Sequence, residues 1–286
     1  MKRGVLFNLL VSLAIVLIST SAQAKIIKTN SRVMTYNLRY DNPHDGDQSW
    51  SHRKAGVISL IKFHGPEILS IQEGLHHQVQ DLKEGLEHYD YVGVGRDNGD
   101  EKGEYAAIFY DSEKYSKVES GNFWLSPTPN KASIGWDAAC IRICTWVKLR
   151  DKVTRQLLFV FNTHFDHVGK EAQRNSAKLI VEKIDKLTEG RETPFVLTGD
   201  FNLTPDDKSI IYLSKEFNDS KQVTRRKPYG PDGTFNSFDF NHKLDQRIDY
   251  IFTSSEVTVE RYAVLSDSKN RHYYSDHLPV LVDIRY

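Results

Sequence analysis

The chain has 286 residues, a length that suits one domain with a sizeable hydrophobic core. Its 38 basic and 38 acidic side chains cancel, so the chain as a whole does not attract a polyanion. This balance excludes a globally basic nucleic-acid-binding protein, and contact with DNA or RNA would need a local basic patch.

The first 24 residues have the pattern of an export signal. Lys2 and Arg3 precede an apolar stretch over 5–18, and Ala22-Gln23-Ala24 is a small-residue cleavage site. The stretch is shorter than the roughly 20 residues of a membrane span. We interpret 1–24 as a signal peptide removed before Lys25, with an uncleaved anchor as the alternative. The domain 25–286 would be exported to the periplasm or the outside, as a monomer without a membrane span. Its net charge is −2, because the signal holds two of the 38 basic residues and no acidic ones.

Strand and helix patterns then alternate along the chain. Apolar periodicity predicts helices over 50–63, with Ser51 as N-cap, and over 76–86, 170–187 and 209–213. Runs rich in β-branched and aromatic residues predict strands over 33–38, 67–72, 89–94, 105–110, 118–125, 141–149, 157–163, 194–198, 250–252, 257–264 and 279–285. This order predicts an α/β fold, a four-layer α/β sandwich of two packed mixed β-sheets flanked by helices. Polar residues at the strand ends would converge at one rim.

The two cysteines, Cys140 and Cys144, lie in a segment that reads as a strand. At roughly 3.3 Å per residue they would lie about 13 Å apart, too far for a disulfide. We interpret them as small buried hydrophobes, with a reactive thiol or metal pair as the alternative.

Two polar residues follow the first two apolar strands. Asn37 directly follows the apolar run 33–36, and Glu73 directly follows the apolar run 68–72. Amide and carboxylate oxygens suit Mg²⁺, with Mn²⁺ or Ca²⁺ as further options. Each alone is an ordinary strand-exit residue, and the reading as metal ligands depends on the other motifs.

The segment 195–202 is the strongest single motif. A buried apolar strand meets a glycine turn that presents Asp200 and Asn202. The carboxylate can bind a metal or orient a water, and the amide can hold a phosphate oxygen. The alternative is an Asx-turn that closes the strand.

Two of the eleven histidines lie at strand ends beside a carboxylate. They are His164 and His277, and Asp249 is the predicted partner that orients one of them.

Together these motifs resemble the endonuclease/exonuclease/phosphatase superfamily, also called DNase-I-like, from Asn37 to His277 in the family's order. The resemblance implies the sandwich fold and a divalent cation, usually Mg²⁺. It implies that Asn37, Glu73 and Asp276 serve the metal, that Asp200 and Asn202 position water and phosphate, that His277 handles the nucleophile's proton and that Asp249 orients a catalytic histidine. His164 fits the branch of DNase I and the sphingomyelinases.

Further polar and aromatic residues are similar to those of uncharacterised secreted bacterial members of this superfamily. Arg53, Arg96 and Arg142 are predicted to grip a phosphate, and Glu104 to support His277. Surface ion pairs are the alternative for all four. Trp124 and Trp136 would stack a sugar or base, or pack in the core.

The sequence therefore predicts a secreted, divalent-metal-dependent phosphoester hydrolase, a phosphodiesterase or phosphatase. We expect His277, aided by Asp200, to deprotonate the attacking water, and His164, held by Asp249, to donate a proton. The substrate would be an ester of a sugar, a lipid headgroup or a small metabolite. A secreted DNA or RNA nuclease is the first alternative, and a binding module that has lost catalysis is the second.

Overall fold

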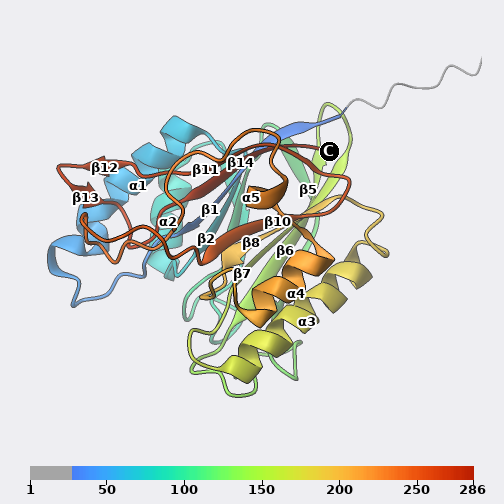
Figure 1. Cartoon of the computed structure of the whole chain (residues 1–286), viewed down its shortest axis with the longest axis horizontal. Coiled ribbons are helices and arrows are strands. Elements are labelled where there is room, and N and C mark those ends of the chain that lie inside the picture. Colours follow the sequence, from blue (N-terminus) through green and yellow to red (C-terminus); the bar gives the residue numbers. More distant parts are fainter. Residues whose placement is uncertain (1–27) are drawn as a thin grey trace, which may run out of the picture.

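The computed structural model describes residues 28–286, so the predicted signal peptide over 1–24 lies outside the described residues. Two six-stranded sheets form the centre of the molecule, and a small two-stranded sheet lies apart from them. Helices α1 and α2 lie on one side of the molecule and α3 and α4 on the other (Figure 1). The predicted four-layer α/β sandwich is confirmed.

The first sheet has the strand order β11-β14-β1-β2-β4-β3. Its strands are β1 (Asn30–Asn37), β2 (Ile68–Gln72), β3 (Tyr89–Val92), β4 (Ile108–Asp111), β11 (Thr258–Val264) and β14 (Val280–Arg285). Only β1 and β2 run parallel here, so their carboxyl ends meet at the same edge. The helices α1 (Trp50–His64) and α2 (His76–Gly85) cover the outer face.

The second sheet has the strand order β5-β6-β7-β8-β10-β9. Its strands are β5 (Tyr115–Trp124), β6 (Ile143–Asp151), β7 (Leu157–His164), β8 (Phe195–Asp200), β9 (Asn218–Asp219) and β10 (Asp249–Thr253). Here β7 and β8 are the parallel pair. The helices α3 (Lys170–Leu187) and α4 (Lys208–Glu216) cover this sheet, and the short α5 (Ser220–Val223) contacts β10 and β11.

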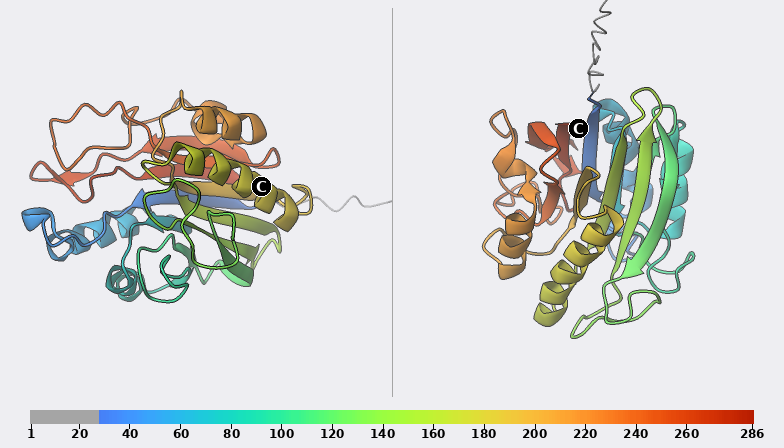
Figure 2. Two further views of the ribbon diagram at one scale, coloured as in Figure 1. Left: turned by 90° about the horizontal axis from the view of Figure 1, so that it is seen from below. Right: turned by 90° about the vertical axis from the view of Figure 1, so that its right-hand side faces the viewer.

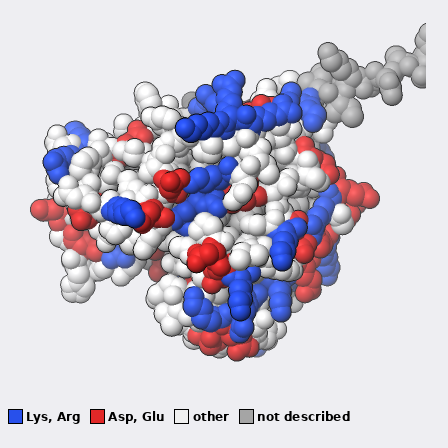
Figure 3. All heavy atoms as spheres, in the orientation of Figure 1, with Lys and Arg blue, Asp and Glu red and all other residues white. Residues whose placement is uncertain are grey.

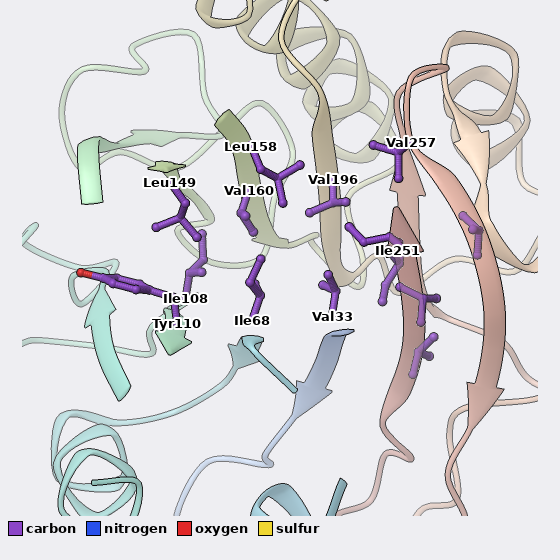
Figure 4. Packing of buried hydrophobic residues seen from close by; sticks show 14 of the residues in the cluster. Val33, Ile68, Ile108, Tyr110, Leu149, Leu158, Val160, Val196, Ile251 and Val257 are labelled. Carbon is purple, nitrogen blue, oxygen red and sulfur yellow. The ribbon is translucent and has the colours of Figure 1, made fainter. Parts of the chain in front are cut away.

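The main core lies between the two sheets. Val33 and Ile68 of the first sheet point toward Val160 and Val196 of the second (Figure 4). Since side chains alternate along a strand, the neighbours of these residues point outward, onto the helices. Both faces of the central strands are therefore buried, as the stacked layers in Figure 2 show, and this explains their nearly continuous apolar sequences.

Several predicted boundaries differ from the structure. Helix α1 is preceded by Ser49 rather than Ser51, and α4 extends to Glu216. Strand β4 begins at Ile108 rather than Tyr105, and Tyr105 forms isolated bridges with Gly74 and Gly95. The sequence missed η1 (Gly46–Gln48), β9, α5 and the hairpin of β12 (Ser268–Lys269) and β13 (His272–Tyr273).

Both cysteines are free, as predicted. Cys144 is fully buried in β6. Cys140, however, is only half-buried and precedes the strand, so the interpretation as a core hydrophobe is wrong for this residue. Over residues 28–286, none of the helices has the length and apolar character that crossing a membrane requires.

Candidate active site

The polar residues at the strand ends meet at one edge of the sandwich. In the parallel register Asn37 lies beside Gln72, and His164 lies beside Asp200. The antiparallel strand β10 places Asp249 opposite Asp200. His277 precedes β14, which pairs with β1, so both sheets contribute residues to this edge.

A cavity of about 420 Å³ opens here. It is lined by predicted residues from both sheets, namely Glu73, Arg96, Glu104, Arg142, His164, Asp200, Asn202, Asp276 and His277. Asn37 and Asp249 are buried just behind its wall. Arg39, Tyr40, His167 and Phe235 also line it, and the sequence did not single them out. His167 lies three residues after His164 at the end of the same strand, and this position was the signal in the sequence that could have identified it.

Asn37 joins the two sheets at the floor of the cavity. Its Nδ2 donates to Glu73 Oε1 at 3.0 Å and to Asp200 Oδ2 at 2.9 Å. Glu73 has a positive φ of 62°, an uncommon conformation for this residue type, and its Oε2 accepts the backbone N–H of Tyr40 at 3.1 Å. The carboxylate is therefore held in a fixed place beside the second sheet.

The charges at this floor fit a divalent cation. One ligand atom each of Glu73, His164 and Asp200 lies within 4.8 Å of the others. Burial, with Asp249 nearby, raises the pKa of Asp200 to about 7 despite the opposing effect of His277. Burial also raises the pKa of Asp276, and Glu73 adds to this. Excess negative charge among hard oxygen donors is what Mg²⁺-type ions neutralise.

His277 is oriented by Asp249. Its Nδ1 lies 2.9 Å from Asp249 Oδ2, and its Nε2 lies 3.7 Å from Asp200 Oδ2 at the cavity. Burial alone would lower the pKa of His277, but Asp249 and Asp200 outweigh it and hold the pKa well above its usual range. The expectation that Asp249 holds His164 is wrong, because the register of β10 gives this carboxylate to His277.

His164 has the opposite electrostatic environment. Burial, Arg142 and Arg96 hold the pKa of His164 well below its usual range, so the ring is neutral. Its Nε2 accepts from Asn202 Nδ2 at 3.0 Å, which leaves the proton on Nδ1. That Nδ1 lies 3.9 Å from Glu104 Oε2 and has no hydrogen-bond partner among the described residues. The prediction that Glu104 supports His277 is therefore wrong, since it lies beside His164.

Two of the three predicted arginines reach the cavity. Arg142 is only 4% exposed, and its Nη2 donates to His167 Nδ1 at 3.0 Å. Within residues 28–286, its Nε and Nη1 have no hydrogen-bond partner. Arg96 forms a bidentate pair with Glu104 at 2.6 and 2.8 Å, and burial raises the pKa of Glu104 to about 7 although Arg96 opposes this. Trp124 donates its Nε1 to the carbonyl of Arg96 at 2.7 Å and so fixes that loop.

Arg53 does not reach the cavity. It is buried, and its guanidinium donates to the backbone carbonyls of Gln48, Leu38, Tyr274 and Arg39. These bonds hold together the loops that follow β1 and precede β14. The prediction that Arg53 grips a phosphate is corrected to a structural role.

The chain is similar to known proteins over most of its length. The model of the endonuclease/exonuclease/phosphatase family matches residues 34–277. The crystal structure of an endonuclease/exonuclease/phosphatase family protein from Bacteroides thetaiotaomicron is 40% identical, with a TM-score of 0.88, over 91% of this chain and 96% of that one. A mannosyl-6-phosphatase from Bacteroides thetaiotaomicron is also 40% identical, with a TM-score of 0.86, over 90% of this chain and 100% of that one. An uncharacterised protein of Acanthamoeba polyphaga mimivirus is 29% identical over 252 residues, covering 82% of this chain and 91% of its own.

Proposed function

The chain belongs to the endonuclease/exonuclease/phosphatase family, and on that premise we propose that it is a divalent-metal-dependent phosphatase that hydrolyses small phosphomonoesters, above all sugar phosphates. The observation that carries the proposal is the buried Arg142, whose free N–H groups belong to a side chain that lines the catalytic cavity. The similarity over nearly the whole chain to a mannosyl-6-phosphatase supports a sugar phosphate as substrate.

Arg142 favours a terminal phosphate over a phosphate inside a chain. Its Nε faces Asp166 Oδ2 at 3.5 Å, whereas Nη1 has no partner among the described residues. Leaving a buried donor unpaired costs about 1–3 kcal/mol, so the retention of Nη1 supports an anionic partner that is not part of the protein. A phosphomonoester carries more negative charge than a diester and offers three acceptor oxygens. Arg142 and Arg96 can satisfy these oxygens through charge-assisted hydrogen bonds.

Glu73, Asn37 and Asp276 would hold the divalent cation, with Asp200 and His164 close by. When bound, such a cation would neutralise a phosphate oxygen and make an attacking water more acidic. Mg²⁺ is the proposed ion, because the donors are mostly carboxylate and amide oxygens.

The chain's own residues handle the protons. With its Nδ1 fixed by Asp249, the neutral form of His277 presents Nε2 to the water and accepts its proton. Because Asp249 and Asp200 raise the pKa of His277, the share of this neutral form, and with it turnover, rises with pH. Asp249 and Asp200 stabilise the imidazolium that forms. Asn202 donates Nδ2 to His164 Nε2 and to the carbonyl of Phe165, and so holds the His164 ring in place at the cavity. His164 has one proton, on Nδ1, which has no hydrogen-bond partner among the described residues and can donate a hydrogen bond to a phosphoryl oxygen. The leaving alkoxide takes its proton from a solvent water.

The alternative within the family is a nuclease. Acidic side chains lie among the basic ones on the face of the described chain that Figure 3 shows, so that face has no uniformly positive track for a polyanion. A binding module without catalysis is disfavoured, because each position that the mechanism needs holds a chemically competent side chain.

One experiment separates these functions. Purified protein with Mg²⁺ is incubated in parallel with hexose 6-phosphates, bis-p-nitrophenyl phosphate, RNA and plasmid DNA. We expect phosphate release from the hexose phosphates and intact plasmid. His277→Ala should abolish turnover, whereas His88→Ala, which changes a histidine whose side chain is 64% exposed, should not. Plasmid nicking that His277→Ala lacks would establish the nuclease instead.

We also propose export of the domain 25–286 to the periplasm or the outside, on the pattern of residues 1–24. Cell fractionation followed by N-terminal sequencing tests this. A protein recovered from the cytoplasm with Met1 intact would contradict it.

A further inference from the structure

Three side chains of types that can bind a metal ion lie together at the catalytic cavity, and none of them is among the proposed magnesium ligands. They are Cys140, Asp166 and His167, and one ligand atom of each lies within 4.8 Å of the others. Cys140 and His167 line the cavity, and Asp166 is buried behind them. The proposed mechanism uses none of the three.

The chemistry of this group differs from that of the floor of the cavity. A thiolate and an imidazole are ligands of soft and borderline ions, whereas the floor offers mostly hard oxygens. Three protein ligands with an open fourth position are typical of Zn²⁺. We propose that Cys140, Asp166 and His167 form a second metal site, which takes Zn²⁺ or a similarly soft divalent cation and, resting on the proposed phosphatase function, inhibits the enzyme by disengaging Arg142.

The carboxylate of this site is already ionised and oriented. Asp166 Oδ1 accepts the backbone N–H groups of Val168 at 3.0 Å and Gly169 at 2.7 Å, and Oδ2 accepts that of Ala139 at 3.1 Å. Burial alone would raise the pKa of Asp166, but these backbone hydrogen bonds outweigh it and lower the pKa to about 2. The group therefore carries its charge over the physiological range, and its position is fixed before any cation arrives.

The thiol is within reach and needs the cation to ionise. Cys140 Sγ lies 3.7 Å from Asp166 Oδ2. Burial raises the pKa of the Cys140 thiol, against the nearby Arg142 and Arg96, so the free site holds a protonated thiol. Binding replaces the S–H bond with a metal–sulfur bond and releases one proton to solvent, without any redox change.

Occupation of the site competes with the placement of Arg142. A guanidinium can only donate, so His167 Nδ1 uses the single lone pair of its neutral ring to accept Arg142 Nη2. A metal ion on His167 must take a ring lone pair, which breaks this hydrogen bond. The ion also lies near Asp166, whose Oδ2 is 3.5 Å from Arg142 Nε, and so repels the guanidinium. Zn²⁺ should therefore weaken phosphate capture and raise KM.

Thiol reactivity tests the site without any turnover. Cys144 is fully buried, so Cys140 is the thiol that an aromatic disulfide reagent meets in the folded protein. We expect Zn²⁺ to slow the reaction of Cys140, and His167→Ala to weaken this protection by at least about tenfold in Zn²⁺ concentration. His88→Ala is the matched control and should keep full protection. An absence of protection, or equal protection in His167→Ala, would overturn the proposal.

Steady-state kinetics test the inhibition. In excess Mg²⁺, Zn²⁺ should raise KM for a phosphomonoester in the unaltered protein, and this effect should be lost in Cys140→Ala. Equal inhibition of both proteins would mean that Zn²⁺ acts at the magnesium ligands and would refute the coupling to Arg142. If Zn²⁺ protects the thiol but no phosphoester is turned over at all, the proposed function fails while the metal site is supported.

Discussion

Replacing Arg142 with methionine removes the buried cation that we assign to phosphate recognition, while keeping much of the side-chain volume. Its Nη1, which carries two N–H groups, has no hydrogen-bond partner in the described part of the chain, whereas Nε faces Asp166 at 3.5 Å. A hydrogen bond to a charged group contributes about 1.5–3 kcal/mol, so two such bonds amount to about 3–6 kcal/mol. At about 1.4 kcal/mol per tenfold change, kcat/KM for a phosphomonoester should fall by roughly 10²- to 10⁴-fold.

The fold should survive this change, because Asp166 keeps its backbone hydrogen bonds to Val168, Gly169 and Ala139. The assay is phosphate release from a hexose 6-phosphate, compared with hydrolysis of bis-p-nitrophenyl phosphate. For the diester kcat/KM should fall less, because its phosphate carries less negative charge for Arg142 to bind. Arg142→Lys should give an intermediate loss, because it keeps the charge without the planar donors.

Arg174→Met on the exposed face of α3 is the matched control and should leave kcat/KM unchanged. A loss of less than about tenfold in Arg142→Met would refute the assignment of phosphate recognition to this residue. An equal loss for monoester and diester would refute the argument that Arg142 selects a terminal phosphate.

Two further predictions concern the carboxylates behind the cavity. Asp249→Asn should lower kcat by about 10²- to 10⁴-fold. It should also move the ascending limb of the pH–rate profile to lower pH, because Asp249 raises the pKa of the base His277; an unmoved limb would contradict this role. Asp166→Asn should destabilise the fold by about 2 kcal/mol at neutral pH in urea unfolding, since folding lowers the carboxyl pKa from 3.8 to about 2. The ionised Asp166 carboxylate stabilises the fold fully at pH values above 3.8, and this stabilisation is lost as the pH falls toward 2. The difference in unfolding free energy between the two proteins should therefore narrow at low pH. If this difference in unfolding free energy stays constant with pH, the charge of Asp166 does not contribute to stability.

The sequence predicted that these polar residues meet at one edge of the sandwich, because that edge depends on strand ends. Asn37, Glu73, His164 and Asp200 each end an apolar strand, and two parallel pairs bring such ends together whatever the loops do. Runs of β-branched and aromatic residues also located most strands, and apolar residues at helical spacing located the long helix α3.

The predictions that were wrong concern contacts between distant parts of the chain. Arg53 is buried because the carbonyls of Leu38 and Tyr274 accept its N–H groups, and the contact with Tyr274 spans 221 residues. The pairing of Asp249 with His277 depends on the register of β10 against β8, which local periodicity does not encode. Cys140 was misread because the turn-rich segment before β6 has strand-forming residues but forms no strand.

The measurement that tests the account most directly is phosphate release from a hexose 6-phosphate by protein stripped with EDTA, before and after Mg²⁺ is restored. Burial raises the pKa values of Asp200 and Asp276 at the floor of the cavity, and neighbouring carboxylates add to this, so a bound cation would be needed to keep both groups ionised. We expect no turnover in the stripped protein, full recovery with Mg²⁺, and no recovery in Glu73→Gln. Undiminished turnover without metal, or no phosphate release with it, would contradict the proposal of a metal-dependent sugar-phosphate phosphatase.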